Sequence, residues 1–195
     1  MRLDRIIVGN GVRPGDRVIG LASNGIHSNG YTLARRVLFE QAGLTVDAVV
    51  PELGGTLGEE LLRPTFIYVR EILELIEHAP DIGALIHITG DGLLNLPRVA
   101  AEVGFVLDAL PPPPPIFGLI ETRGGISRAE MFEVYNMGIG FCVVLPERDV
   151  EAALAILARH GRQAWVIGQA VADPQKQVHL PTHGLIGSGK RFRAA

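Results

Sequence analysis

The chain has 195 residues, of which 47% are hydrophobic and 20% are charged, and its formal net charge at pH 7 is -3. This size and composition predict one compact α/β domain spanning residues 1–195. No apolar run approaches the roughly 18 residues of a membrane-spanning helix, and the N-terminal residues have no signal-peptide pattern. The small negative charge gives no basic field for nucleic acid. We therefore expect neither a nucleic-acid partner nor a membrane partner.

The single cysteine, Cys142, excludes an internal disulfide framework and a multi-cysteine zinc site. It lies within an apolar run, where we expect it to be packed. Three histidines show no metal-ligand spacing, namely His160, His179 and His183. We infer a reducing, cytoplasmic setting and predict no metal site.

The N-terminal half predicts strands and helices in alternation. Residues 17–22 (RVIGLA) predict a strand, and residues 31–42 predict a helix that ends at Gly43. Residues 44–58 are expected to form a loop with a short turn. Pro64 is expected to begin a second helix, PTFIYVREILELIEHA. The buried stripe of that helix is predicted to be Ile67, Ile72, Leu75 and Ile76.

The alternation continues after residue 80. Residues 84–89 (ALIHIT) predict a buried strand, followed by a glycine turn and a short helical segment, and FVLD predicts another strand. Pro111 to Pro115 are expected to be a rigid spacer before a helix at residues 117–122. Ser127 and Glu130 have the spacing of a capping box. The remaining segments are the strand IGFCVVLP, the amphipathic helix ERDVEAALAILARHG, the strand AWVIGQAV with QVHL paired to it, and a polar tail over residues 181–195.

This order does not follow a strict βαβ rhythm, so the sequence predicts an α/β sandwich with a mixed sheet.

The loop SNGIHSNG lies between the first strand and the first helix. Helix-start amides lack intrahelical acceptors and favour anions, and glycines allow a ligand to approach the backbone. The loop therefore predicts an anion cradle for a phosphate, formed by Ser23, Asn24, His27, Ser28, Asn29 and Gly30. The alternative is a turn with an ordinary Ser or Asn N-cap.

The run HITGDGLLNLPR follows the strand at residues 84–89. Ligands bind beyond the carboxyl ends of strands in such sheets, and Arg98 is suited to clamping a phosphate or carboxylate. The predicted second wall of the site is Thr89, Gly90, Gly92, Asn95 and Arg98. The alternative is a β-turn with a surface arginine. His87 fits a core histidine with a hydrogen-bond partner.

Two further motifs follow in the C-terminal half. In EMFEVYNMGIGF, Asn136 and Gly138 join a helix to a strand, either as part of the site or as a helix terminator. GLIGSGKR has the spacing of a P-loop. Its lysine is followed by Arg191 instead of Ser or Thr, and only five residues remain after Lys190. We therefore reject a P-loop.

Three segments together resemble one family, in the family's order: GDRVIGLASNGIHSNGYTLARRVL, HITGDGLLNLPRV, and EMFEVYNMGIGFCVVLP followed by AWVIG. They are similar to the C-terminal half of aminoimidazole ribonucleotide synthetase, also called phosphoribosylformylglycinamidine cyclo-ligase. The resemblance runs from about residue 4 to residue 171. It implies the mixed-sheet α/β sandwich of that C-terminal domain, and a ligase that forms a C–N bond in purine biosynthesis.

The resemblance also implies partners and cofactors. The family closes the ring of formylglycinamidine ribonucleotide in an ATP-dependent reaction. An N-terminal domain supplies the dimer core and most of the ATP and magnesium site. That half has no counterpart here, so residues 1–15 are interpreted as a linker remnant. We expect a phosphorylated ribonucleotide substrate and a homodimer for the full-length form. We also expect an inactive isolated chain with no general base assigned.

Three departures from the family pattern bear on the substrate. The usual TGGG is TGDG, with Asp91 in place of a glycine. The following segment is one residue shorter than the family's ENIPRV and lacks its acidic residue, and TFN becomes VYN, which removes a hydroxyl at Val134. These changes leave open a second hypothesis, a stand-alone or paralogous domain that acts as a non-catalytic binding or regulatory module.

Overall fold

The computed structural model describes residues 6–79 and 81–195. Its centre is an eight-stranded sheet in the order β10-β9-β8-β5-β7-β1-β6-β4. The strands are β1 (Arg17–Ala22), β4 (Ala84–His87), β5 (Val103–Val106), β6 (Ile139–Leu145), β7 (Ala164–Ala172), β8 (Val178–Leu180), β9 (Leu185–Ser188) and β10 (Arg191–Ala194). The β5–β8 pair is parallel, and the other pairs are antiparallel. The predicted mixed sheet is confirmed.

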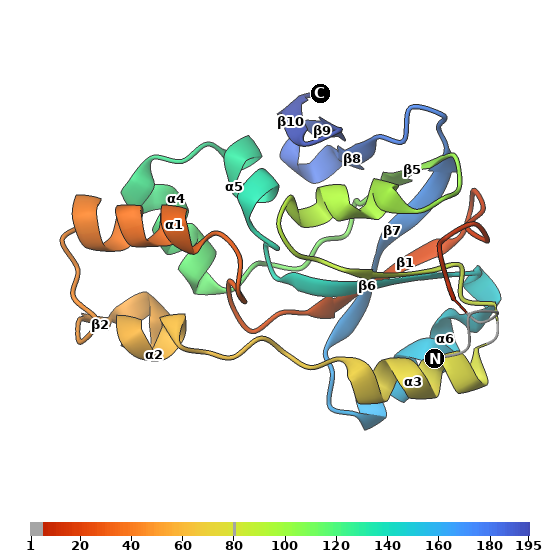
Figure 1. The fold of residues 1–195 in the computed structure, drawn as a ribbon, viewed down its shortest axis with the longest axis horizontal. Helices are drawn as coiled ribbons and strands as arrows, with labels where there is room; N and C mark the ends of the chain where they lie inside the picture. The colour runs from red at the N-terminus through yellow and green to blue at the C-terminus, as the bar shows by residue number, and fades with distance from the viewer. Residues whose placement is uncertain (1–5, 80) are drawn as a thin grey trace.

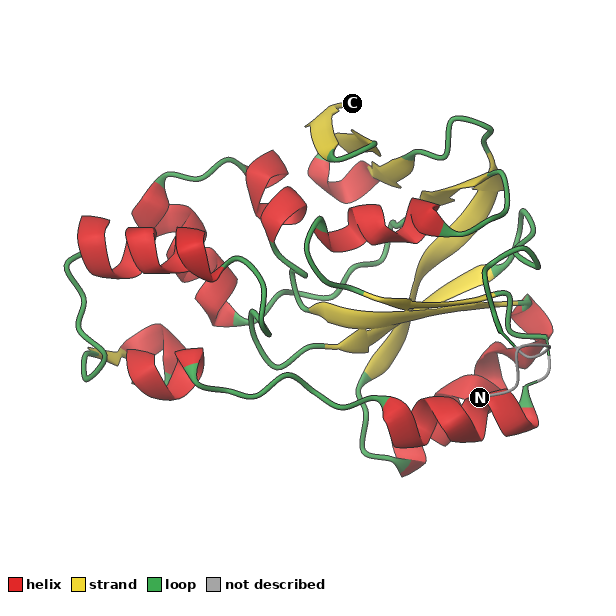
Figure 2. Cartoon of the chain, viewed as in Figure 1, coloured by secondary structure: helices red, strands yellow, loops and turns green. Residues whose placement is uncertain are grey.

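Helices cover both faces of the sheet, as Figure 2 shows. Alternate residues of β1 and β6 face opposite sides, because side chains alternate along a strand. Ile19 and Val143 pack with the helices α3 (Val69–His78) and α6 (Val150–Arg159). Val18 and Val144 belong to the larger core on the other face. The predicted α/β sandwich is confirmed.

The larger core is closed by the helices at the left of Figure 1. These are α1 (Tyr31–Arg35), which continues as a π-helical segment (Arg36–Gln41), α4 (Pro115–Gly124) and α5 (Arg128–Val134). Phe117 and Phe132 are buried there. The end of β1 and the start of β6, paired at Ala22 and Ile139, face this group of helices. The loop SNGIHSNG follows from that end.

The second helix begins later than predicted. α3 starts at Val69, and residues 64–68 have no regular secondary structure. Tyr68 is buried, and its hydroxyl donates to the Ala22 carbonyl at 2.8 Å. Ile67 is 74% exposed, so only Ile72 and Leu75 of the predicted stripe are buried. The reason is tertiary: the burial of Tyr68 and its hydrogen bond to β1 outweigh the helical propensity of this segment.

Residues 44–58, predicted as a loop, contain regular structure. β2 (Val49–Val50) and β3 (Gly55–Thr56) form a short hairpin. The helix α2 (Leu57–Leu61) begins with a capping box between Thr56 and Glu59. Ser127, where the sequence predicts such a box, caps α5 only through its own side chain, which accepts from the Glu130 amide at 3.2 Å.

The predicted polar tail is wrong. β9 and β10 form a hairpin whose Phe192 is buried, with its ring centroid 6.0 Å from that of Phe132. β8 pairs with β5 and β9, and not with β7 as predicted.

At the other end of the chain, the described part of the expected linker packs on the domain: Val12 is buried, and the Val8 carbonyl accepts from the Ala100 amide at 3.1 Å. In the described residues, no helix combines the length and apolarity needed to cross a membrane.

Candidate functional site

Three segments that are distant in sequence meet at the end of β1. They are the loop at residues 23–30, the turn at residues 89–95 and the segment at residues 134–138. Ser23 Oγ donates to Asn136 Oδ1 at 2.8 Å, and Tyr135 Oη donates to the Gly30 carbonyl at 3.1 Å. Asn29 Oδ1 lies 3.8 Å from the Cβ position at Gly90. The structure therefore brings the three predicted motifs together.

The helix after the loop has no side-chain cap. Its N-cap is Gly30, which has φ 76, and no side chain accepts from the first turn. The helix begins at Tyr31, as predicted, and the alternative in which Ser28 or Asn29 is an ordinary N-cap is wrong. Ser28 is exposed, and its hydroxyl lies 3.1 Å from that of Thr65. A Cβ at Gly30 would lie 2.3 Å from the Tyr135 ring, so only glycine fits there.

The inner part of the loop holds buried polar atoms without partners. Within the described residues these atoms are Asn24 Oδ1, His27 Nδ1 and His27 Nε2. Buried polar groups are normally paired, so three orphans in one loop need an explanation. Burial, with a smaller contribution from His87, lowers the pKa of His27 to about 4. His27 is therefore neutral at pH 7.

The neutral state of His27 determines which ligand groups the inner part of the loop complements. A neutral imidazole offers one N–H donor and one acceptor, and Asn24 Oδ1 is an acceptor only. Such a set suits a group that both donates and accepts, and it does not favour a dianion. Anion chemistry is available nearer the surface, where Ser28 and Asn29 adjoin the start of α1.

The turn at residues 89–95 is held together by Asn95. Its Oδ1 accepts from the Thr89 amide at 2.7 Å, and its Nδ2 donates to the Gly90 carbonyl at 2.7 Å. Arg98 pairs with Asp91 at 2.6 Å, so the carboxylate of the TGDG motif is offset by this arginine. Asp91 has φ 73, a conformation that glycine adopts readily and Asp tolerates. At Gly92 a Cβ would lie 2.4 Å from the Phe132 carbonyl oxygen.

The side chain of Asn136 makes its hydrogen bonds within the protein. Its Oδ1 accepts from Ser23 Oγ and from the Gly138 amide, each at 2.8 Å. Its Nδ2 donates to the Gly25 carbonyl at 2.9 Å. The hydrogen bonds of Ser23, Asn95 and Asn136 are thus used within the protein. Of the other predicted residues, Asn24, His27, Ser28, Asn29 and Gly30 lie in the loop after β1, and Thr89, Gly90 and Arg98 follow β4.

The segment at residues 64–68 crosses the loop, although no sequence motif assigned it to the site. Asn24 Nδ2 donates to the Pro64 carbonyl at 2.8 Å. The rings of Phe66 and Tyr68 each have their centroid 6.3 Å from that of His27. The signal in the sequence was a period of two, with Phe66 and Tyr68 facing inward and Ile67 and Val69 outward.

Two other neighbours of the loop were missed. A Cβ at Gly140 would lie 2.7 Å from His27 Cε1, so the β6 backbone forms the floor below the imidazole. Glu60 is buried beside Gly25, and burial raises the pKa of its carboxyl group, with Arg63 opposing the shift. His87 is exposed and stacks on Phe141 with their ring centroids 6.0 Å apart. The prediction of a core histidine at this position is wrong.

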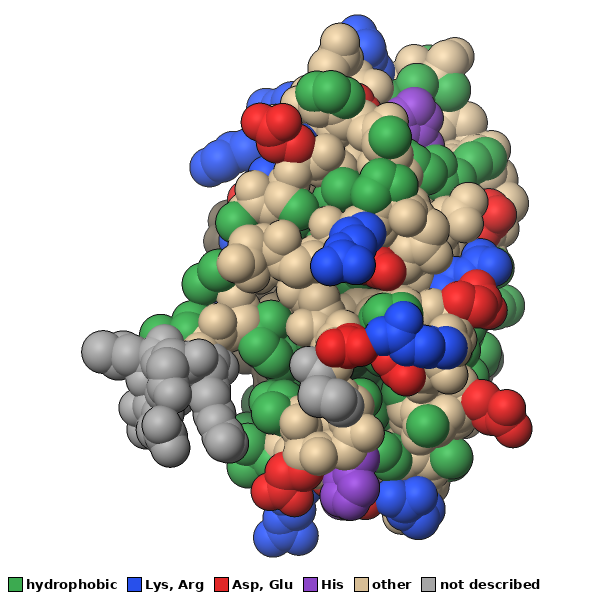
Figure 3. All heavy atoms as spheres, turned by 90° about the vertical axis from the view of Figure 1, so that its right-hand side faces the viewer, with side chains coloured by type: hydrophobic (Ala, Val, Ile, Leu, Met, Phe, Trp, Pro, Cys, Tyr) green, Lys and Arg blue, Asp and Glu red, His purple; other side chains and the backbone are tan. Residues whose placement is uncertain are grey.

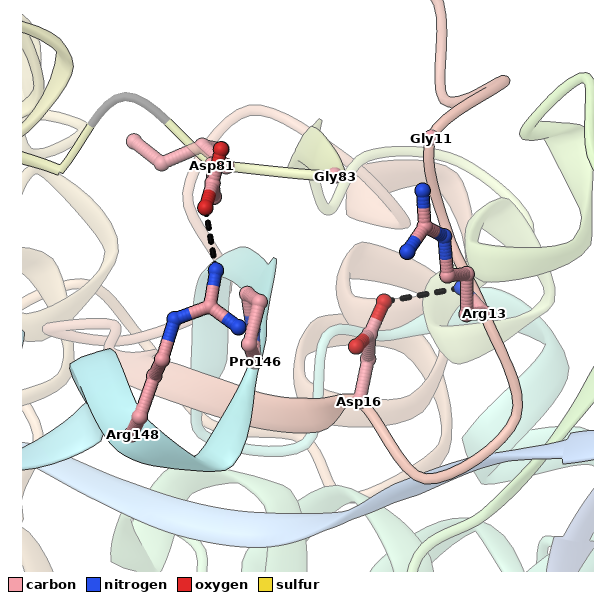
Figure 4. Close-up of a pocket in the computed structure, with 8 residues that line it drawn as sticks. Gly11, Arg13, Asp16, Asp81, Gly83, Pro146 and Arg148 are labelled. Carbon is pink, nitrogen blue, oxygen red and sulfur yellow. Dashed lines mark hydrogen bonds and ion pairs between the residues drawn. The ribbon is translucent and has the colours of Figure 1, made fainter.

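A separate cavity of about 350 Å³ lies at the opposite end of the sheet, near the start of β1. Figure 4 shows Arg148 paired with Asp81, while Asp16 accepts from the Arg13 amide at 2.8 Å. These groups of opposite charge leave no net charge to recognise an ion. The described part of the same face carries interspersed acidic and basic side chains (Figure 3). We therefore place the candidate site at the loop.

The sequence profile described as "AIR synthase related protein, C-terminal domain" matches residues 13–181. The chain belongs to this family. The resemblance carried by the three motifs is thereby confirmed. Among the curated relatives, the phosphoribosylformylglycinamidine cyclo-ligase of Methanothermobacter thermautotrophicus is 49% identical over 178 residues. That of Alkaliphilus oremlandii is 45% identical over 181 residues.

Each of these alignments covers 91% of this chain but only 51% and 52% of the respective relative. The chain thus spans about half the length of the curated relatives it matches. Among solved structures, thiamine-monophosphate kinase from Stenotrophomonas maltophilia has a TM-score of 0.58 and 21% identity, with 90% of this chain and 52% of that chain covered. E. coli HypE, a hydrogenase maturation protein, has a TM-score of 0.55 and 18% identity, with 96% and 50% covered. Both show the shared fold alone.

Proposed function

We propose that this chain is the substrate-binding C-terminal domain of an ATP-dependent cyclo-ligase. The reaction converts formylglycinamidine ribonucleotide into aminoimidazole ribonucleotide in purine biosynthesis. The observation that carries the proposal is the set of three buried, unpartnered polar atoms of Asn24 and His27 in one loop. An unpaired buried polar group costs about 1–3 kcal/mol, and a bound substrate group relieves this cost.

The substrate and the two parts of the loop have matching chemistry. The formyl-amide and amidine groups donate and accept hydrogen bonds, as neutral His27 and the Asn24 carbonyl oxygen require. The phosphate suits the outer part, where the uncapped first turn of α1 adjoins Ser28 and Asn29. The domain orients the substrate, and no proton-transfer role is assigned to His27.

Magnesium has no set of ligands in the described part of this chain. No group of three or more His, Cys, Asp or Glu side chains there is arranged to hold a metal ion, and Asp91 is engaged with Arg98. We assign the magnesium and nucleotide sites to the N-terminal domain that the family resemblance implies, and we derive no step through either. Because phosphoryl transfer depends on metal and nucleotide positioning, the isolated chain is expected to be inactive. ATP-dependent cyclisation by the purified chain would contradict this.

Isothermal titration of the wild type and His27→Asn tests the proposal. The ligands are formylglycinamidine ribonucleotide, aminoimidazole ribonucleotide and inorganic phosphate. Asn is chosen because it tolerates the φ of 56 at this position. We expect the substrate to bind more tightly than phosphate, and His27→Asn to weaken substrate binding about tenfold while leaving phosphate binding unchanged. The control is His78→Asn, an exposed residue of α3. Equal substrate binding by the wild type and His27→Asn would remove His27 from the site.

A further inference from the structure

Residues 64–68, here called the strap, lie over the only described buried side-chain atoms that lack hydrogen-bond partners. The strap has no regular secondary structure and runs between α2 and α3. Two of its carbonyls accept from side chains, Pro64 O from Asn24 Nδ2 and Ile67 O from Arg162 Nη2. A segment held in this way opens locally at lower cost than a strand within the sheet.

Arg162 makes three kinds of contact that involve the strap or its anchor. Its Nη2 donates to the Ile67 carbonyl at 2.7 Å, and its Nε forms an ion pair with the buried carboxylate of Glu71 on α3. Its guanidinium carbon lies 4.6 Å from the centroid of the Phe66 ring, within cation–π range. One planar side chain thus fixes the strap backbone, the Phe66 ring and the start of α3 together.

The backbone of Arg162 is itself well fixed. Its amide donates to the Leu157 carbonyl at 3.0 Å, just after the turn at Gly161 that ends α6. The next residue, Gln163, accepts from the Ala22 amide at 2.9 Å. Arg162 therefore projects from a rigid point beside the start of the loop. The position of the strap therefore depends more on Arg162 than on backbone pairing with a strand or helix.

The Phe66 and Tyr68 rings cover His27 from the strap side, and the β6 backbone at Gly140 closes the other side. The titratable and charged groups around the imidazole are Tyr68 on the strap, His87 at the end of β4, and Arg162 and Cys142 near the Tyr68 ring. A ligand reaches the nitrogens of His27 only when this cover moves.

We propose that the strap is a movable cover over His27 and that Arg162 is the positioning residue that holds it closed. Opening exposes Asn24 and His27 to the substrate, and closure over the bound substrate excludes water. The inference rests on the proposed function for its purpose. The movement itself is testable without any substrate.

The test is the rate at which diethyl pyrocarbonate modifies His27 at pH 7, read by peptide mass spectrometry. Exposed His78 in the same chain is the internal reference. In the wild type we expect His27 to react far more slowly than His78. Arg162→Ala and Arg162→Lys are expected to raise the His27 rate about tenfold, because the strap opens more often. Lysine keeps the charge beside Glu71 but cannot stack on Phe66 and bind Ile67 O at once.

The matched control is Arg159→Ala, which also removes an arginine that ties α6 to α3, there through Glu74. It is expected to lower the melting temperature as Arg162→Lys does, while leaving the His27 rate unchanged. Equal His27 rates in Arg162→Lys, Arg159→Ala and the wild type would overturn the inference, as would a wild-type His27 that reacts as fast as His78. If Arg162→Ala does not fold, the lysine variant decides. Failure of the substrate titration alone would leave these rates unaltered, so the two proposals fail separately.

Discussion

His27 is a buried imidazole that stays neutral, and this makes the stability of the domain depend on pH. Its pKa is lowered to about 4 in the folded chain, chiefly by burial, whereas an unfolded histidine has a pKa of about 6.5. Between these values the unfolded chain binds the additional proton. Stability from this residue is therefore complete above about pH 6.5 and declines as the pH falls toward 4, by up to about 1.4 kcal/mol per pH unit.

Urea denaturation of the wild type and His27→Asn at pH 7.5, 6 and 5 measures this contribution. We expect the free energy of unfolding of the wild type to fall more steeply with decreasing pH than that of the variant. Parallel pH dependences would show that His27 gains a proton equally in the folded and unfolded chains.

Position 140 requires glycine because the side chains of Tyr68 and His27 approach its backbone closely. A Cβ there would lie 2.0 Å from Tyr68 Oη and 2.7 Å from His27 Cε1. Gly140→Ala is expected to destabilise the domain by about 1–3 kcal/mol through overpacking, measured by urea denaturation. Gly118→Ala is the control, because no atom lies within 4 Å of its Cβ position in α4. There the change is expected to stabilise the helix by up to about 1 kcal/mol. A tolerated Gly140→Ala would contradict the packing described for His27.

At single residues, the sequence located the polar loop but not the use of each side chain. Ser23 and Asn136 are 113 positions apart, and their 2.8 Å hydrogen bond follows from the pairing of β1 with β6. Asp91 and Arg98 both follow β4, and their ion pair joins two residues that the sequence singled out separately. Arg162 was missed because nothing local connects the end of one helix to a segment about a hundred residues earlier.

Among the elements, the β9–β10 hairpin is the clearest difference between the structure and the prediction, which was a polar tail. Phe192 is buried against Phe132, so Phe192→Ala is expected to cost about 3–5 kcal/mol. Arg193→Ala, at the neighbouring exposed position, is expected to change stability little. Urea denaturation of both variants checks this. A Phe192→Ala variant as stable as the wild type would mean that these residues do not pack.

Most helices and strands were predictable because their apolar periods are strong, as in α6 and β6. The predictions failed where two periods compete. The segment PTFIYVREILELIEHA contains both periods. Ile72 and Leu75 have the helical spacing of buried residues in α3, whereas burial alternates at every second residue from Phe66 to Val69. The short glycine-rich hairpin β9–β10 has too few apolar residues to show a period.

For the whole molecule, α3 presents an exposed apolar row of Val69, Leu73 and Ile76 beside exposed Ile67. Exposed apolar patches favour association. We expect the isolated chain to self-associate at high concentration and Leu73→Glu to reduce this without lowering the melting temperature. Sedimentation velocity of both proteins checks it. A wild type that stays monomeric over the same concentrations would contradict the expectation.

The sheet order was not predictable from the sequence, since β5 pairs with both β7 and β8, one antiparallel and one parallel. The class of the sheet was predictable from the irregular alternation of strands and helices.

The central claim, that the loop after β1 receives the ribonucleotide, is tested most directly by amide chemical-shift mapping. The labelled chain is titrated with formylglycinamidine ribonucleotide while the backbone and histidine side-chain signals are followed. The account predicts that the largest shifts belong to residues 23–33 and 89–91 and to the His27 ring, with little change around Arg13 and Asp16 at the opposite end of the sheet. Saturable shifts that spare the loop and His27 and gather elsewhere on the described surface would contradict it.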